Sequence, residues 1–179
     1  MSRKTTDFET PGTPGCSSPP CYAADFPGYF GEGETPLDPA VTAGLNALLE
    51  AERAGAKVLA ILREGLDAGA QARTLLDGLQ KDEGANAVVL YKTIRRLGGV
   101  ASHETGAFVG KTLAVDGFAA RLAFLNKGQA WVVRKIEQLL PAIRDAEARD
   151  MLQAMHRSHL DNIAACEAFL AHAGGDPAA

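Results

Sequence analysis

The chain has 179 residues, of which 46% are hydrophobic and 22% are charged, and its formal net charge is −4. This length and composition are typical of a globular protein with one domain and a sizeable core. The acidic balance argues against a nucleic-acid partner, and the sequence contains neither an apolar stretch long enough to span a membrane nor a secretory signal, so we expect a cytoplasmic protein.

Residues 1–37 are rich in Pro, Gly, Ser and Thr and follow neither a helical nor a strand period, which predicts an irregular arm. Residues 21–30 hold four of the chain's eleven aromatic residues. Because aromatic side chains favour burial, we expect part of the arm to dock on the rest of the domain or on a neighbouring subunit. Cys16 and Cys21 also lie in the arm, where two free thiols suit a cytosolic protein better than a disulfide or half of a metal site.

Four amphipathic helices follow the arm, indicated by apolar residues at three- and four-residue spacings. Asp38 and Pro39 form a favourable start for the first helix, and Asp116 is the predicted N-cap of the third. Gly98 and Gly99 are the expected stop of the second. The predicted helices span about residues 39–66, 70–97, 116–140 and 146–172.

The connection between the second and third helices, about residues 98–115, is long enough to run the length of the domain and can include a short helix. Two helical hairpins joined by one long connection are a known topology of four-helix bundles. The sequence therefore predicts an all-α four-helix bundle over residues 38–173, followed by a disordered tail at 174–179.

Each predicted helix carries polar residues near its midpoint on an otherwise apolar stripe. Helices of similar length packed side by side bring these midpoints into one layer. Burying unpartnered charge costs several kcal/mol, so the layer needs an explanation, and a metal ion is the first to consider. The residues concerned are Glu52, Glu83, Asn86, Gln129, His156 and His159.

This arrangement resembles the ferritin-like superfamily, in which two helices each give a Glu and the other two each give a Glu-x-x-His pair to a metal centre. The resemblance implies that Glu52 is the Glu of the first helix, Glu83 the Glu of the first pair and His159 the His of the second. The segments SPPCY at 18–22 and IRRLGG at 94–99 are similar to those of a bacterial branch of this superfamily. That likeness supports the fold more than an activity.

Three positions depart from the family pattern. Asn86 stands where a His is expected, and Gln129 and His156 stand where Glu is expected. Two carboxylates balance one divalent ion better than two, so we expect one Fe, Mn or Zn ion held by Glu52, Glu83 and His159, with His156 or Gln129 in support. Such a site leaves open positions for oxygen or a small substrate, and its activity would be oxidase-like or metal-handling.

The alternative is a metal-free layer in which the same carboxylates, imidazoles and amides hydrogen-bond to one another. The protein would then be a degenerate ferritin-like bundle acting as an interaction or scaffold module. In either case self-association as a homodimer is expected, and no substrate can be named. Cys166 is predicted to be a small core residue, and Trp131 a packing or interface residue.

Overall fold

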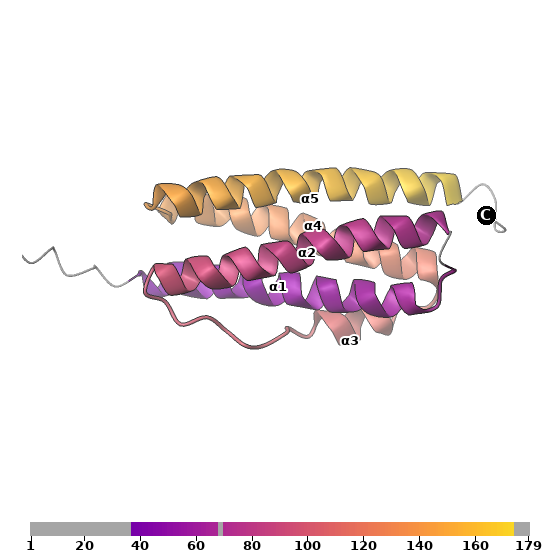
Figure 1. Ribbon diagram of the computed structural model, residues 1–179, viewed down its shortest axis with the longest axis horizontal. Coiled ribbons are helices and arrows are strands. Elements are labelled where there is room, and N and C mark those ends of the chain that lie inside the picture. Colours follow the sequence, from indigo (N-terminus) through magenta and orange to yellow (C-terminus); the bar gives the residue numbers. More distant parts are fainter. Residues whose placement is uncertain (1–36, 68–69, 174–179) are drawn as a thin grey trace, which may run out of the picture. The chain divides into compact units, whose positions relative to one another are not determined.

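The computed structural model describes residues 37–67 and 70–173, and within them every regular element is a helix (Figure 1). The predicted all-α class is therefore confirmed. Four helices are long, and a fifth, α3, is a short helix inside the predicted connection. The elements are α1 (Pro39–Glu64), α2 (Gln71–Arg96), α3 (Phe108–Leu113), α4 (Phe118–Leu139), the 3-10 turn η2 (Leu140–Ala142) and α5 (Ala146–Ala173).

Local chemistry explains several helix ends. The Asp38 carboxylate accepts a hydrogen bond from the backbone N–H of Ala40 at 2.7 Å, and Pro39 occupies the first helical position, as predicted. At the end of α2, Gly98 adopts a φ of 77°, a conformation that glycine reaches without steric cost. The predicted cap of the third long helix is wrong: Gly117, not Asp116, precedes α4, because a φ of 82° at this turn suits only glycine.

The long helices pack as two antiparallel hairpins, α1 on α2 and α4 on α5. Contacts of α1 with α4 and of α2 with α5 join the hairpins. The connection from α2 to α4 runs along the length of the helices, as its residue count predicted, and places α3 against α1 and α4 (Figure 1). This path brings one short helix beside the middle of the domain.

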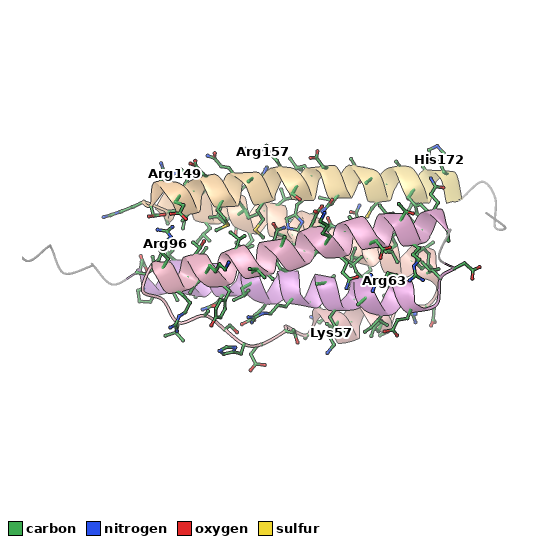
Figure 2. All side chains as sticks on the ribbon, viewed as in Figure 1. Lys57, Arg63, Arg96, Arg149, Arg157 and His172 are labelled. Atoms are coloured by element: carbon green, nitrogen blue, oxygen red, sulfur yellow. The ribbon has the colours of Figure 1, made fainter. Side chains whose placement is uncertain are left out.

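The interior contains two apolar clusters rather than one. One cluster holds residues of the first half of α1, such as Leu45 and Leu48, together with Ile94 and Leu152. The other lies towards the opposite ends of the same helices and includes Leu59. Basic side chains such as Lys57 and Arg157 point outward from the helices (Figure 2). The middle segments of the helices separate the two clusters.

Several predictions fall outside the described residues: the arm at 1–36 with Cys16 and Cys21, and the tail at 174–179. Cys166 is described, and it is buried, as predicted. Among the described helices, none combines the length and the apolar character that crossing a membrane requires.

Candidate functional site

A layer of polar side chains fills the space between the two apolar clusters. Each long helix contributes to it, because each carries its polar residues on the stripe that faces inward. Glu52 and His159 are fully buried, Gln129 is 2% exposed and Glu83 is 3% exposed. The sequence placed these four correctly in one interior layer. Asn162, one turn after His159, is also buried there and was not predicted.

The Glu52 carboxylate is the centre of the hydrogen bonds in this layer. His159 Nε2 lies 2.9 Å from Glu52 Oε1, and Asn86 Nδ2 donates to Glu52 Oε2 at 3.1 Å. Both oxygens of Glu52 therefore have a partner. This bonding gives Asn86 a role at the position where the ferritin-like pattern has a His: its amide satisfies a buried carboxylate.

Glu83 lies in a different environment from Glu52. Its carboxyl packs directly over Gly55 of α1, where a Cβ would overlap both carboxyl oxygens. Burial raises the pKa of Glu83 well above 4.5, and the nearby carboxylates of Glu52 and Asp82 raise it further. Glu83 is therefore favoured as a neutral acid, which can donate a hydrogen bond as well as accept one.

His156 does not join the layer, so its predicted place there is wrong. Its Nε2 lies 3.1 Å from Glu137 Oε1, in a pair whose side chains are 23% and 56% exposed. Residues three apart on a helix differ in direction by about 60°. Because His159 points to the centre of the layer, His156 lies at the edge of α5, where it contacts Glu137 of α4.

The layer also holds buried polar atoms that lack a protein partner. Within the described residues six such side-chain atoms occur, on five residues. All five lie on the segments that separate the two apolar clusters. An unpaired buried polar atom costs about 1–3 kcal/mol, so their concentration indicates a place for a further hydrogen-bonding group. The atoms are Gln80 Oε1, Asn126 Oδ1, both Nε2 and Oε1 of Gln129, His159 Nδ1 and Asn162 Nδ2.

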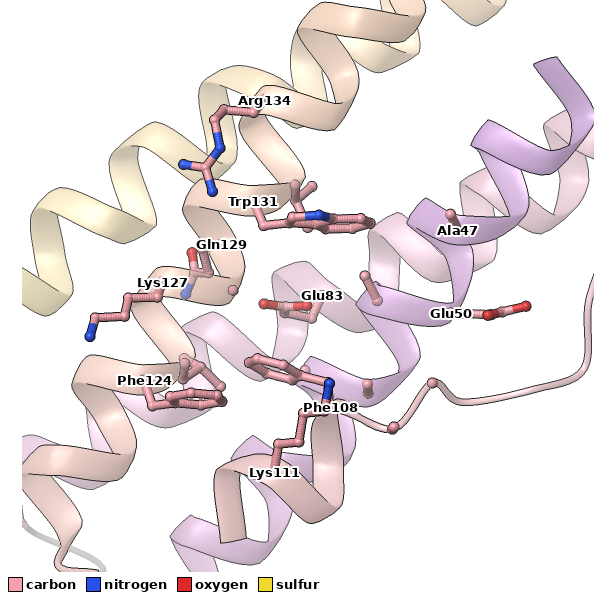
Figure 3. A pocket seen from close by; sticks show the side chains of 18 residues that line it. Ala47, Glu50, Glu83, Phe108, Lys111, Phe124, Lys127, Gln129, Trp131 and Arg134 are labelled. Carbon is pink, nitrogen blue, oxygen red and sulfur yellow. The ribbon is translucent and has the colours of Figure 1, made fainter. Parts of the chain in front are cut away.

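A pocket of about 540 Å³ reaches this layer from the surface between α1, α3 and α4. Glu83 and Gln129 form its polar inner end. Phe108, Phe124 and Trp131 supply aromatic walls, and Figure 3 shows the Glu83 carboxyl between the rings of Trp131 and Phe108. The volume lies within the range of small-molecule sites in proteins. The pocket thus connects solvent to the unpaired amide of Gln129.

Sequence reasoning missed the aromatic walls, and it assigned Trp131 only to packing or an interface. Phe108 reaches α4 because Gly128 has no side chain: a Cβ at Gly128 would collide with the Phe108 ring. Phe108 and Phe124 then stack with ring centroids 5.5 Å apart. The glycine directly before Gln129 was the available signal that another element approaches α4 closely at this level.

Hydrogen bonds to α1 hold the connection that forms one side of the pocket. Asn46 Nδ2 donates to the Val100 carbonyl at 2.9 Å, and the Ser102 N–H donates to Asn46 Oδ1 at 2.7 Å. The Ser102 hydroxyl donates to Glu50 Oε1 at 2.6 Å, and Arg53 donates to the Ser102 carbonyl. Ser102 therefore fastens the segment that leads into α3.

The side chains of the layer do not fit the two-metal centre that the ferritin-like resemblance implies. Within residues 37–67 and 70–173, no group of three or more His, Cys, Asp or Glu side chains is arranged to hold a metal ion. Both oxygens of Glu52 have protein partners, and amides stand at the positions of Asn86 and Gln129. A single ion remains a prediction, and it would require at least one oxygen of Glu52 to exchange its hydrogen-bond partner for the ion.

Comparison with known proteins places the chain in a family. No curated protein matches the sequence. A crystal structure of a protein from Xanthomonas campestris pv. campestris has a similar fold, with a TM-score of 0.60 and 11% sequence identity over 75% of this chain and 88% of that one. Residues 39–168, which include the whole polar layer, match the family model described as Domain of unknown function (DUF6306), and the chain belongs to this family.

Proposed function

We propose that the chain forms a ferritin-like four-helix bundle that binds a small organic molecule in the pocket between α1, α3 and α4. The carrying observation is that this pocket leads to Gln129, whose amide is buried with neither its oxygen nor its nitrogen bonded. A ligand with a hydrogen-bonding head would satisfy both atoms. The proposal is one of binding and assigns no reaction.

The burial of the inner end supports this function over a purely structural polar layer. A structural network that specifies packing is most useful when every member has a partner. The Glu52 carboxylate meets that condition, because Asn86 and His159 bond to its two oxygens, although His159 Nδ1 has no partner. At Gln129 it is not met, and this is the residue that the pocket reaches.

A matched pair of α1 variants tests the proposal. Ala47 lines the pocket, so Ala47→Phe would place a ring inside it. Ala43 lies one turn earlier on α1 and is exposed, so Ala43→Phe adds the same ring outside. Saturation-transfer NMR with a library of aromatic fragments should give binders of the wild type and of Ala43→Phe that are lost with Ala47→Phe. If Ala47→Phe leaves every binder unaffected, the pocket is not a binding site.

A second candidate function is the binding of one divalent ion by Glu52, Glu83 and His159. It is favoured by the contact of two fully buried groups, Glu52 and His159, with the Glu83 carboxyl near enough to be affected by the charge of Glu52. Protein purified without chelator, then supplied with Fe, Mn or Zn, would retain the ion and melt at a higher temperature. An unchanged melting temperature with no retained metal would exclude this candidate.

Self-association and location remain predictions from the sequence. A homodimer interface could bury the apolar side chains of Val88, Val89 and Leu160, which are 53%, 43% and 46% exposed. Sedimentation velocity would measure the oligomeric state directly. A cytoplasmic location is likewise an expectation that cell fractionation can test.

A further inference from the structure

We propose that the ligand of this pocket is an amphipathic anion: a planar ring system with an uncharged hydrogen-bonding head at its inner end and an acidic group at its outer end. This inference rests on the proposed small-molecule site and adds the chemical class of the ligand. Three parts of the pocket carry it: the inner end at Glu83 and Gln129, the aromatic walls, and the cations at the mouth.

The inner end selects an uncharged head. Gln129 offers one amide donor pair and one acceptor, both buried without a protein partner, at the end of the pocket that Glu83 also lines. An amide, a lactam or a hydroxyl can pair with such groups without bringing a charge into the core. A carboxylate head would meet Glu83, and behind it Glu52, in a place where unpaired charge is costly.

The walls select a flat body. Phe108 and Phe124 stack with an interplanar angle of only 17°, and Trp131 lies on the other side of the Glu83 carboxyl (Figure 3). Aromatic side chains that line a pocket favour planar rings, which they can contact over a large area. Trp131 is 42% exposed although it is the chain's only tryptophan, so a ring in the pocket would cover apolar surface that is now open to solvent.

The mouth selects a negative charge. Lys111 of α3 and Lys127 and Arg134 of α4 line the pocket, and all three are exposed. In the part of the chain that the structure describes, none of them forms an ion pair with a carboxylate. Glu50, the other acidic residue of the lining besides Glu83, lies on α1 and accepts a hydrogen bond from Ser102. Three cations without an ion-pair partner among the described residues are thus among the residues that line this aromatic-walled pocket.

Three related naphthalene probes test each part with the full chain. The first, 6-carbamoylnaphthalene-2-sulfonate, has both head and acid; 2-naphthamide has only the head; naphthalene-2-sulfonate has only the acid. Quenching of Trp131 fluorescence and calorimetry measure the affinities. We expect the two-ended probe to bind about tenfold more tightly than 2-naphthamide, since two or three exposed ion pairs together give an effect of this size. Added salt should reduce this advantage.

Variants separate the charge at the mouth from the site itself. Lys111→Glu and Lys127→Glu should each weaken binding of the two-ended probe and leave 2-naphthamide unchanged, while Lys92→Glu, an exposed change on α2 away from the pocket, should affect neither. If 2-naphthamide binds, is lost with Ala47→Phe, and gains nothing from the sulfonate, the anion inference is overturned and the binding site stands. If no probe binds in a way that Ala47→Phe abolishes, both are overturned.

Discussion

Replacing Glu83 by Gln should make the protein more stable at neutral and alkaline pH, because it removes a carboxyl that burial disfavours in its charged form. Burial and the charges of Glu52 and Asp82 raise the pKa of Glu83 above its ordinary value of 4.5 in the folded state. Between 4.5 and the folded-state pKa, the folded chain holds a proton that the unfolded chain has released. Over that window one such proton lowers the free energy of unfolding by about 1.4 kcal/mol for each unit of rising pH.

The measurement is urea denaturation of wild type and Glu83→Gln at a series of pH values from 4 to 9. Gln keeps the shape and most of the hydrogen-bonding capacity of the neutral acid, so the two proteins should be similar near pH 4 and diverge as the pH rises, with the variant more stable. Glu64→Gln, at the exposed end of α1, is the control and should run parallel to wild type. Parallel curves for Glu83→Gln, or a variant less stable at high pH, would refute the reasoning and indicate that ionised Glu83 has a partner such as a metal ion.

Three further changes test packing at Glu83, an ion pair at the helix ends and the anchoring of the connection. Gly55→Ala places a methyl group against the Glu83 carboxyl and should cost roughly 1–3 kcal/mol in urea denaturation, whereas Gly78→Ala, in open space on α2, should be neutral or stabilise by up to about 1 kcal/mol. Asp145→Asn should lower the melting temperature, because hydrogen bonds hold the pKa of folded Asp145 at about 2, below the ordinary value of 3.8. The difference from wild type should become smaller as the pH falls from 3.8 to about 2, because Asp145 then becomes protonated and its contribution to stability is lost. Ser102→Ala should speed amide hydrogen exchange in residues 100–107, measured by mass spectrometry, and an unchanged rate would show that Ser102 does not hold this segment.

Features of the fold that depend on residues adjacent in the sequence could be predicted from the sequence. The start of α1 at Pro39 follows from the capping of Ala40 by Asp38, and the end of α2 follows from the glycine pair. The start of α4 could not be predicted in the same way, because Asp116 and Gly117 are both plausible at a helix start. The positive φ of 82° at the residue before α4 decides between them, and neighbouring residues do not report that conformation.

Prediction of the site succeeded where one helix face determines burial and failed where two helices decide together. Glu52, Glu83, Gln129 and His159 were placed correctly, because an apolar stripe directs its polar members inward. The apolar stripe of α5 includes positions at the edge of the helix as well as positions that face the centre. Spacing alone therefore could not distinguish His156 from His159. The pocket depends on the approach of α3 to α4, and no periodicity within either segment reports it.

The polar layer between the two apolar clusters also has a consequence for helix register. Most inward positions of the long helices are leucine or another aliphatic residue, so the apolar clusters alone would tolerate a shift of one helix along another by a turn. Such a shift would part His159 from Glu52 and bury both against aliphatic side chains, at a cost of several kcal/mol. The polar layer therefore fixes the register of the helices relative to one another. The aliphatic residues on either side of it do not have to specify this register.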